Sequence, residues 1–140
     1  MRVLVIALLM LIAEVALPPI MFGAAPVPAG ARVQELLRQP LAEKPGTDVV
    51  AIRVEYAPGG TTPPHAHPAF VYAYVLEGAV VSQLDNEKPK TYSAGQIWSE
   101  SPGQHHMISR NASATEPATL LVFLIIAHNA QLTVPIVAGH

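Results

Sequence analysis

Proline and glycine divide this chain into short segments. The 140 residues include 14 prolines and nine glycines, and proline in particular ends regular structure because it lacks a backbone N–H donor. Between these breaks, side chains of different character alternate and β-branched residues are frequent, as in VVAIRVEY at 49–56 and FVYAYVLEG at 70–78. This pattern predicts half-buried strands that end at tight turns.

Further short segments have the same character. Strands are predicted at 79–84, 90–92, 96–100 and 105–109, each bounded by Gly, Pro, Asn or Ser residues. The largely apolar segment TLLVFLIIAH at 119–128 is read as a long buried strand, although ten residues are also enough for a buried helix. Seven or eight short strands in one chain indicate an all-β sandwich or barrel.

The N-terminus has the pattern of a signal peptide. Arg2 precedes an unbroken apolar run at 3–13, and small residues follow up to Ala31. We therefore expect a signal peptide over 1–31 with cleavage near Ala31, and a periplasmic or secreted product without stable membrane association after cleavage. The alternative is an uncleaved N-terminal anchor that continues past Glu14.

The rest of the chain fits a single domain. We divide it into an N-terminal arm at 32–46, a barrel at 47–128 and a C-terminal tail at 129–140. Within the arm, VQELL at 33–37 suggests one helical turn or an extended arm that packs against a neighbouring subunit, and exposed strand edges also favour a homodimer.

Charge and cysteine content exclude several functions. The formal net charge is −2, and no residue is cysteine. A chain without a basic surface is a poor candidate for nucleic-acid binding. Disulfides, thiolate metal ligands and cysteine nucleophiles are also excluded.

The segment TTPPHAHPAF at 61–70 places two histidines one residue apart. Pro63, Pro64 and Pro68 favour an extended backbone, and alternate residues of an extended segment point to the same side. His65 and His67 could therefore form half of a metal site. Two solvated histidines in a polar loop are the simpler interpretation of this pair alone.

The spacing of later residues strengthens the metal interpretation. Gly59 precedes the two histidines and Gly78 follows them, while a second group contains Gly95, Gly103 and His106. In order and spacing these residues resemble the two motifs of the cupin superfamily, over roughly residues 47–127. The resemblance implies a double-stranded β-helix (jelly-roll) barrel of the small single-domain type, inside which His65, His67 and His106 bind one divalent transition metal. Iron, manganese, nickel, zinc and copper all accept imidazole ligands.

One departure from the cupin pattern affects the metal site. The position at which the family carries a glutamate ligand is Val71, which cannot bind a metal. Glu100 is the acidic residue nearest the second motif. It is predicted either to turn inward, as a distant ligand or a catalytic acid/base, or to lie at the rim and pair with Arg53 or Arg110.

Other side chains near the motifs have simpler interpretations. His105 should face away from His106, and His128 and His140 are expected to be solvated. A further expectation concerns four aromatic residues that should line or cap the barrel, namely Phe70, Tyr72, Tyr74 and Trp98. The triplet at 111–113 has the pattern of a glycosylation acceptor, which arises often by chance.

Three functions remain open at this point. The first is a metalloenzyme acting on a small organic molecule as an oxygenase, isomerase or lyase. The second is a non-catalytic barrel that binds a small molecule or a metal, which the missing glutamate favours. The third is a metal-free structural barrel, which would leave all three motif histidines without a use.

Overall fold

A computed structural model describes residues 30–136 of the chain. All regular elements in this range are strands: β1 (Ala31–Pro40), β2 (Thr47–Tyr56), β3 (Thr61–Thr62), β4 (His65–Ala66), β5 (Ala69–Glu77), β6 (Ala79–Leu84), β7 (Lys90–Ser93), β8 (Ile97–Glu100), β9 (His105–Asn111), β10 (Ala118–Ala127) and β11 (Val134–Pro135). Nearly all of the expected signal peptide, and His140, lie outside the described residues. Between residues 30 and 136, no helix is long and apolar enough to cross a membrane.

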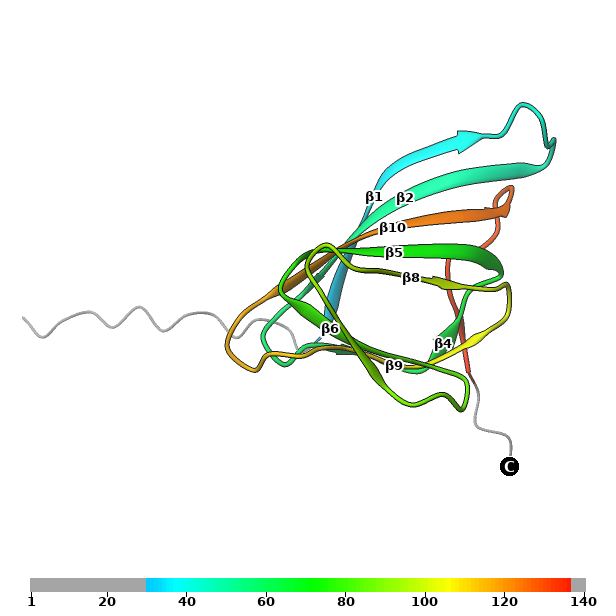
Figure 1. Ribbon diagram of the computed structural model, residues 1–140. Helices are drawn as coiled ribbons and strands as arrows, with labels where there is room; N and C mark the ends of the chain where they lie inside the picture. Colours follow the sequence, from blue (N-terminus) through cyan, green and yellow to red (C-terminus); the bar gives the residue numbers. More distant parts are fainter. Residues whose placement is uncertain (1–29, 137–140) are drawn as a thin grey trace, which may run out of the picture.

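The strands form two antiparallel sheets that face each other (Figure 1). The first sheet has the order β1-β2-β10-β5-β8. The second has the order β11-β4-β9-β6-β7, and β3 also pairs with β9. Sequence neighbours such as β4 and β5 lie in different sheets, which is the arrangement of a jelly-roll barrel. The predicted all-β, double-stranded β-helix fold is confirmed.

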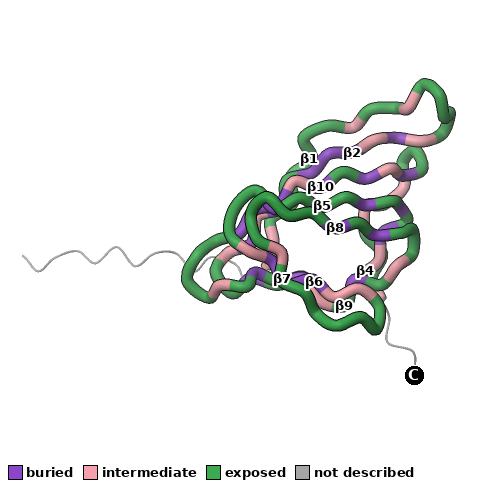
Figure 2. The backbone as a smooth tube through the Cα atoms, viewed as in Figure 1, coloured by how far each residue is buried: buried purple, intermediate pink, exposed green. Residues whose placement is uncertain are grey.

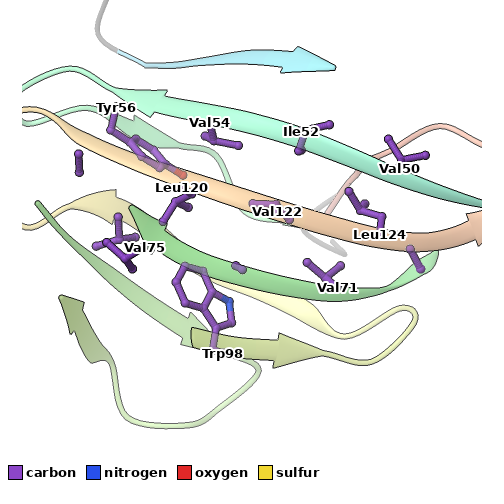
Figure 3. Close-up of a cluster of buried hydrophobic side chains, with 14 of the residues drawn as sticks. Val50, Ile52, Val54, Tyr56, Val71, Val75, Trp98, Leu120, Val122 and Leu124 are labelled. Atoms are coloured by element: carbon purple, nitrogen blue, oxygen red, sulfur yellow. The ribbon is translucent and has the colours of Figure 1, made fainter. Parts of the chain in front are cut away.

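Alternation of side chains explains the first sheet. Its inward apolar residues come mostly from β2, β5 and β10, and Figure 3 shows Ile52, Val71 and Val122 pointing to the same side. The segment predicted as a strand at 119–128 is β10, which pairs with β2 on one side and β5 on the other. The helical alternative for this segment is therefore wrong, because its backbone groups are used in two strand pairings.

Three of the four aromatic residues lie outside the barrel, contrary to expectation. Phe70, Tyr72 and Tyr74 are 48%, 43% and 39% exposed. Their neighbours on β5 point inward instead, and these are small: Ala69, Val71, Ala73 and Val75. Alternation sorts β5 into two sets but does not say which set faces the core. Trp98 is buried, as expected.

The segment at 33–37 is part of a strand and not a helical turn. β1 pairs with β2 over its whole length, with a bulge between Glu35 and Leu37. It forms the edge of the first sheet, and most of its residues are exposed (Figure 2). An isolated amphipathic pentapeptide does not decide between helix and strand, and here the pairing with β2 does.

The two sheets contribute differently to the interior. The first sheet supplies most of the buried apolar side chains, whereas the second supplies buried polar ones, among them Ser82, His106 and Ser109. Asn111 is also buried, and its side-chain amide donates to the carbonyl oxygens of Ala57 and Glu116. A side chain engaged in this way is not available for glycosylation.

Candidate metal centre

The three motif histidines meet between the sheets. His65 lies in β4 and is the direct register partner of His106 in β9, so both side chains project from the same face of the second sheet. His67 follows β4 and is fixed by a hydrogen bond in which the Gly103 N–H donates to the His67 carbonyl oxygen, at 2.8 Å. One donor atom from each of the three histidines lies within 4.8 Å of the other two.

Backbone carbonyls orient two of the rings. His65 Nδ1 lies 2.8 Å from the Pro63 oxygen, and His67 Nδ1 lies 2.6 Å from the Leu132 oxygen. Because a carbonyl only accepts, each Nδ1 carries the hydrogen and each Nε2 keeps a free lone pair. The two Nε2 atoms are 3.2 Å apart. Two lone pairs at this distance repel each other unless a cation lies beside both.

A serine hydroxyl fixes the third ring. His106 Nε2 lies 2.9 Å from Ser82 Oγ. When Nε2 donates its hydrogen to this hydroxyl, Nδ1 is the nitrogen with a free lone pair. His106 Nδ1 is buried and has no hydrogen-bond partner among the described residues. This nitrogen is therefore available as a metal ligand.

Glu100 points inward from β8. Its Oε1 lies 3.2 Å from His106 Nδ1, and its Oε2 lies 3.9 Å from His67 Nε2. The indole N–H of Trp98 donates to Oε1 at 3.0 Å, whereas Oε2 is buried without a hydrogen-bond partner in the described range. Of the two positions predicted for Glu100, the structure has the inward one: Arg53 pairs with Glu55 instead.

The surroundings shift the pKa of two of these groups. Burial alone would raise the pKa of Glu100, but contacts with His106, His67 and Trp98 outweigh burial and hold that pKa below its ordinary value. Burial lowers the pKa of His65, and the neighbouring His67 and His106 lower it further. An ionised carboxylate and a neutral imidazole are the forms that bind metal ions.

The centre lies in the wall of a cavity of about 480 Å³. Most of its other lining is apolar, with Ile52, Val54, Val71, Leu120 and Val122 among the residues of the first sheet. A second polar group consists of Tyr56, whose hydroxyl lies 2.7 Å from Ser109 Oγ and 3.3 Å from Thr62 Oγ1. No lysine or arginine is among the described residues that line the cavity. Its size and lining suit a small, largely apolar molecule.

The other two histidines in the described part of the chain lie apart from the centre. His105 is exposed, on the opposite face of β9 from His106. The His128 side chain is half exposed, as expected, but its Nδ1 also lies 3.0 Å from Oδ1 of the buried Asp48. This Asp48 contact was not predicted, since residues 48 and 128 meet only through the pairing of β2 with β10.

The donor set fits a divalent transition metal. Three lone-pair nitrogens and a carboxylate oxygen converge, and two of these atoms are buried polar atoms without a partner in the described part of the chain. A buried polar atom that lacks a hydrogen bond is costly, and a bound cation would satisfy all of these atoms at once. The three histidines could thus hold a metal.

Sequence reasoning missed the groups that orient the rings. Ser82 and the Leu132 carbonyl are far from the histidines in sequence and belong to no motif. Alternation within 79–84 places Ser82 on the same face as Val80, so a serine on a predicted buried face was the available signal for this residue. Nothing in the sequence indicates that the carbonyl of residue 132 approaches His67.

The fold and the centre define a class: a small double-stranded β-helix barrel with a three-histidine site inside it. The family model described as "Cupin domain" matches residues 52–124, which is just over half of the chain. The chain belongs to the cupin family.

Relatives and solved structures agree with this assignment. Oxalate oxidase 1 of Hordeum vulgare is 33% identical over 121 residues, covering 78% of this chain and 55% of the relative. Germin-like protein 5-1 of Oryza sativa subsp. japonica is 32% identical over 114 residues, covering 76% of this chain and 45% of the relative. The chain thus spans about half the length of the curated relatives it matches. A structure of recombinant oxalate oxidase in complex with glycolate has a TM-score of 0.59 at 29% identity, covering 81% of this chain and 58% of that one.

A smaller protein shows the same fold at lower identity. The double-stranded beta-helix protein from Klebsiella pneumoniae subsp. pneumoniae has a TM-score of 0.59 at 22% identity, and the match covers 76% of this chain and 85% of that chain. The match therefore covers most of that double-stranded beta-helix protein.

Proposed function

We propose that this protein binds one divalent transition metal (iron, manganese, nickel, zinc or copper) through His65, His67 and His106, and acts on a small organic molecule held in the adjoining cavity. The reaction class is that of an oxygenase, isomerase or lyase. The observation that carries the proposal is the convergence of three imidazoles with free lone pairs at an apolar cavity. Similarity to a relative named oxalate oxidase supports a reaction on a small organic molecule.

The metal would act as a Lewis acid toward an oxygen atom of the substrate. The carbonyl oxygens of Pro63 and Leu132 keep Nε2 of His65 and His67 directed at one point, so the chain itself preorganises the ligands. The apolar walls exclude water from the bound molecule. Among the described residues that line the cavity, Glu100 is the one with an acidic side chain. Its carboxylate lies where it can bind the metal or take up a proton.

Charge limits the substrates that fit. A dication with three neutral imidazoles and one carboxylate has a net charge of +1, and the described lining contributes no lysine or arginine. A monoanion, or a neutral molecule that forms an enolate, would balance this charge, whereas a dianion would be left partly unpaired in an apolar cavity. We therefore favour a substrate with one anionic or enolisable head and an apolar body.

Metal analysis tests the proposal. The untagged protein, purified without chelator, should contain about one metal ion per chain by elemental analysis. A variant with His65→Ala, His67→Ala and His106→Ala should contain none, while the control His105→Ala, which changes an exposed neighbour, should keep the metal. Absence of metal from the wild type after reconstitution with all five dications would refute the metalloenzyme. A metal-loaded protein that binds small monoanions but turns none over would identify the non-catalytic alternative.

We also propose that residues 1–31 direct the protein to the periplasm or out of the cell. The support is the sequence pattern of the segment. Cell fractionation and N-terminal sequencing of the purified protein test this. A mature N-terminus near residue 32 is expected, and a membrane-bound chain that keeps residue 1 would show the uncleaved anchor instead.

We infer that two copies pair through the edge formed by β1. This ten-residue edge strand has exposed Val33, Leu36 and Leu37, and a long apolar edge is a template for pairing with another strand. Two β1 edges related by a two-fold axis would extend the first sheet. Sedimentation should give a dimer for the wild type and a monomer for Leu36→Glu/Leu37→Glu. A monomeric wild type at tens of micromolar would exclude this interface.

A further inference from the structure

We propose that Glu100 is the fourth protein ligand of the metal and that it takes over, from the adjacent strand, the place of the glutamate that Val71 replaces. The inference rests on the metal centre proposed above. Val71 is in β5 and Glu100 is in β8, and the two residues are direct register partners. Paired residues of adjacent strands project from the same face of a sheet, with the strands about 4.8 Å apart. The carboxylate has therefore moved sideways by one strand while it still points into the same part of the interior.

Two of three distances between donor atoms fit one coordination shell, and the third is longer. For metal–donor bonds of about 2.1 Å, adjacent donors lie about 3.0 Å apart at right angles and about 3.4 Å apart in a tetrahedron. The His65 and His67 Nε2 atoms are 3.2 Å apart, and Glu100 Oε1 is 3.2 Å from His106 Nδ1. Glu100 Oε2 is 3.9 Å from His67 Nε2. The carboxylate is thus adjacent to two of the three imidazole donors.

The hydrogen bonding of Glu100 leaves one oxygen free for a metal. Trp98 donates its indole N–H to Oε1 and so fixes the orientation of the carboxylate. Oε2 is buried and has no hydrogen-bond partner among residues 30–136. A buried carboxylate oxygen without a hydrogen bond is stabilised by a nearby cation, and the described lining of the cavity contains no lysine or arginine. A metal bound to the three histidines is the cation that the geometry offers.

This assignment changes the interpretation of Val71. Val71 replaces the glutamate ligand of the cupin motif, but the centre still has a carboxylate ligand, which Glu100 supplies. Three imidazoles and a carboxylate remain, contributed by both sheets, and the net charge of the occupied centre is +1 instead of +2. Val71 itself lies in the cavity wall and is 1% exposed, so its apolar side chain adds to the apolar lining.

A positional swap tests the proposal on the full protein. Glu100→Gln keeps the size of the side chain and an acceptor for the Trp98 N–H but removes the anionic ligand. The double variant Val71→Glu/Glu100→Val returns the carboxylate to the family position on β5. Glu77→Gln, at an exposed position of β5, is the matched control. For each variant we would measure the affinity for Co²⁺ by competition with a chelator and record the visible absorption spectrum of the Co²⁺ form.

The expected result is a specific pattern of loss and recovery. Glu100→Gln should weaken Co²⁺ binding by more than about 100-fold, because loss of a ligand exceeds the 10- to 100-fold effect of an outer partner, and it should shift the Co²⁺ absorption bands. The swap should recover binding to within about tenfold of wild type, and Glu77→Gln should match wild type. If circular dichroism shows that Glu100→Gln does not fold, Glu100→Asp is measured instead, with weakened binding and shifted bands expected.

Two outcomes would overturn the assignment. Unchanged affinity and an unchanged Co²⁺ spectrum in Glu100→Gln would show that Glu100 is not a ligand. A weaker affinity with an unchanged spectrum would make it an outer partner only. In both cases the wild type still binds metal, so the three-histidine centre stands. A wild type that binds no Co²⁺ would instead refute the metal centre itself.

Discussion

Replacement of Ser82 by alanine should weaken the metal centre without removing any ligand. The Ser82 hydroxyl is buried and lies 2.9 Å from His106 Nε2. Because Nε2 donates its hydrogen to this hydroxyl, Nδ1 keeps the lone pair that can bind a metal. In Ser82→Ala, His106 Nε2 loses its hydrogen-bond partner. The His106 ring is then no longer held in one orientation. The same change leaves a buried polar atom unsatisfied.

The size of both effects can be estimated. A buried donor or acceptor without a partner costs about 1–3 kcal/mol, so the free energy of unfolding of the metal-free protein should fall by about this amount. Loss of an outer hydrogen bond to a metal-binding histidine typically lowers metal affinity about 10- to 100-fold, or about 1.4–2.7 kcal/mol. Ser93→Ala, which changes an exposed serine in β7, should leave both quantities unchanged.

Tryptophan fluorescence provides the assay. Trp98 is the single tryptophan of the chain, and its ring centroid lies 6.2 Å from that of His106. A paramagnetic ion such as Co²⁺ at the centre should therefore quench the emission, and a titration gives the dissociation constant. Urea unfolding of the metal-free protein gives the stability. If Ser82→Ala bound Co²⁺ within twofold of wild type, the proposed orientation of His106, with Nδ1 toward the metal, would be refuted.

Two further predictions concern the barrel itself. The hydrogen bond from His128 holds the pKa of Asp48 below its ordinary value of 3.8. Ionised Asp48 therefore stabilises the folded protein above about pH 4. This stabilisation is lost as the pH falls through the lower pKa of Asp48 in the folded state. The urea midpoint should therefore fall more steeply below pH 4 in wild type than in Asp48→Asn, and parallel curves would contradict this. Gly78→Ala should cost about 2–4 kcal/mol in urea unfolding, because Gly78 has a φ of +70° and an added Cβ would lie 2.5 Å from the Pro117 oxygen. Gly46→Ala, with a φ of +78° and open space around the Cβ, should lower the free energy of unfolding only through backbone strain. An equal decrease in Gly46→Ala and Gly78→Ala would contradict the steric part of the prediction.

Much of the fold could be predicted from local patterns. Alternation along the segment located β2 and β5, and a continuous apolar segment rich in β-branched residues located β10, because both patterns are properties of the segment itself. The same reasoning failed for β1, whose conformation depends on pairing with β2. It also failed for Tyr72 and its neighbours, because both faces of β5 are apolar and alternation alone does not choose between them.

The candidate site divides in a similar way. The sequence determined that His65 and His67 point to one side, because proline and residue spacing are local constraints, and the motif spacing added His106 as their partner. Only the tertiary structure decided that Glu100 turns inward beside them and that Ser82 and the Leu132 carbonyl orient the rings. These contacts join segments far apart in the chain, and the pairing of strands and the packing of one sheet on the other bring them together.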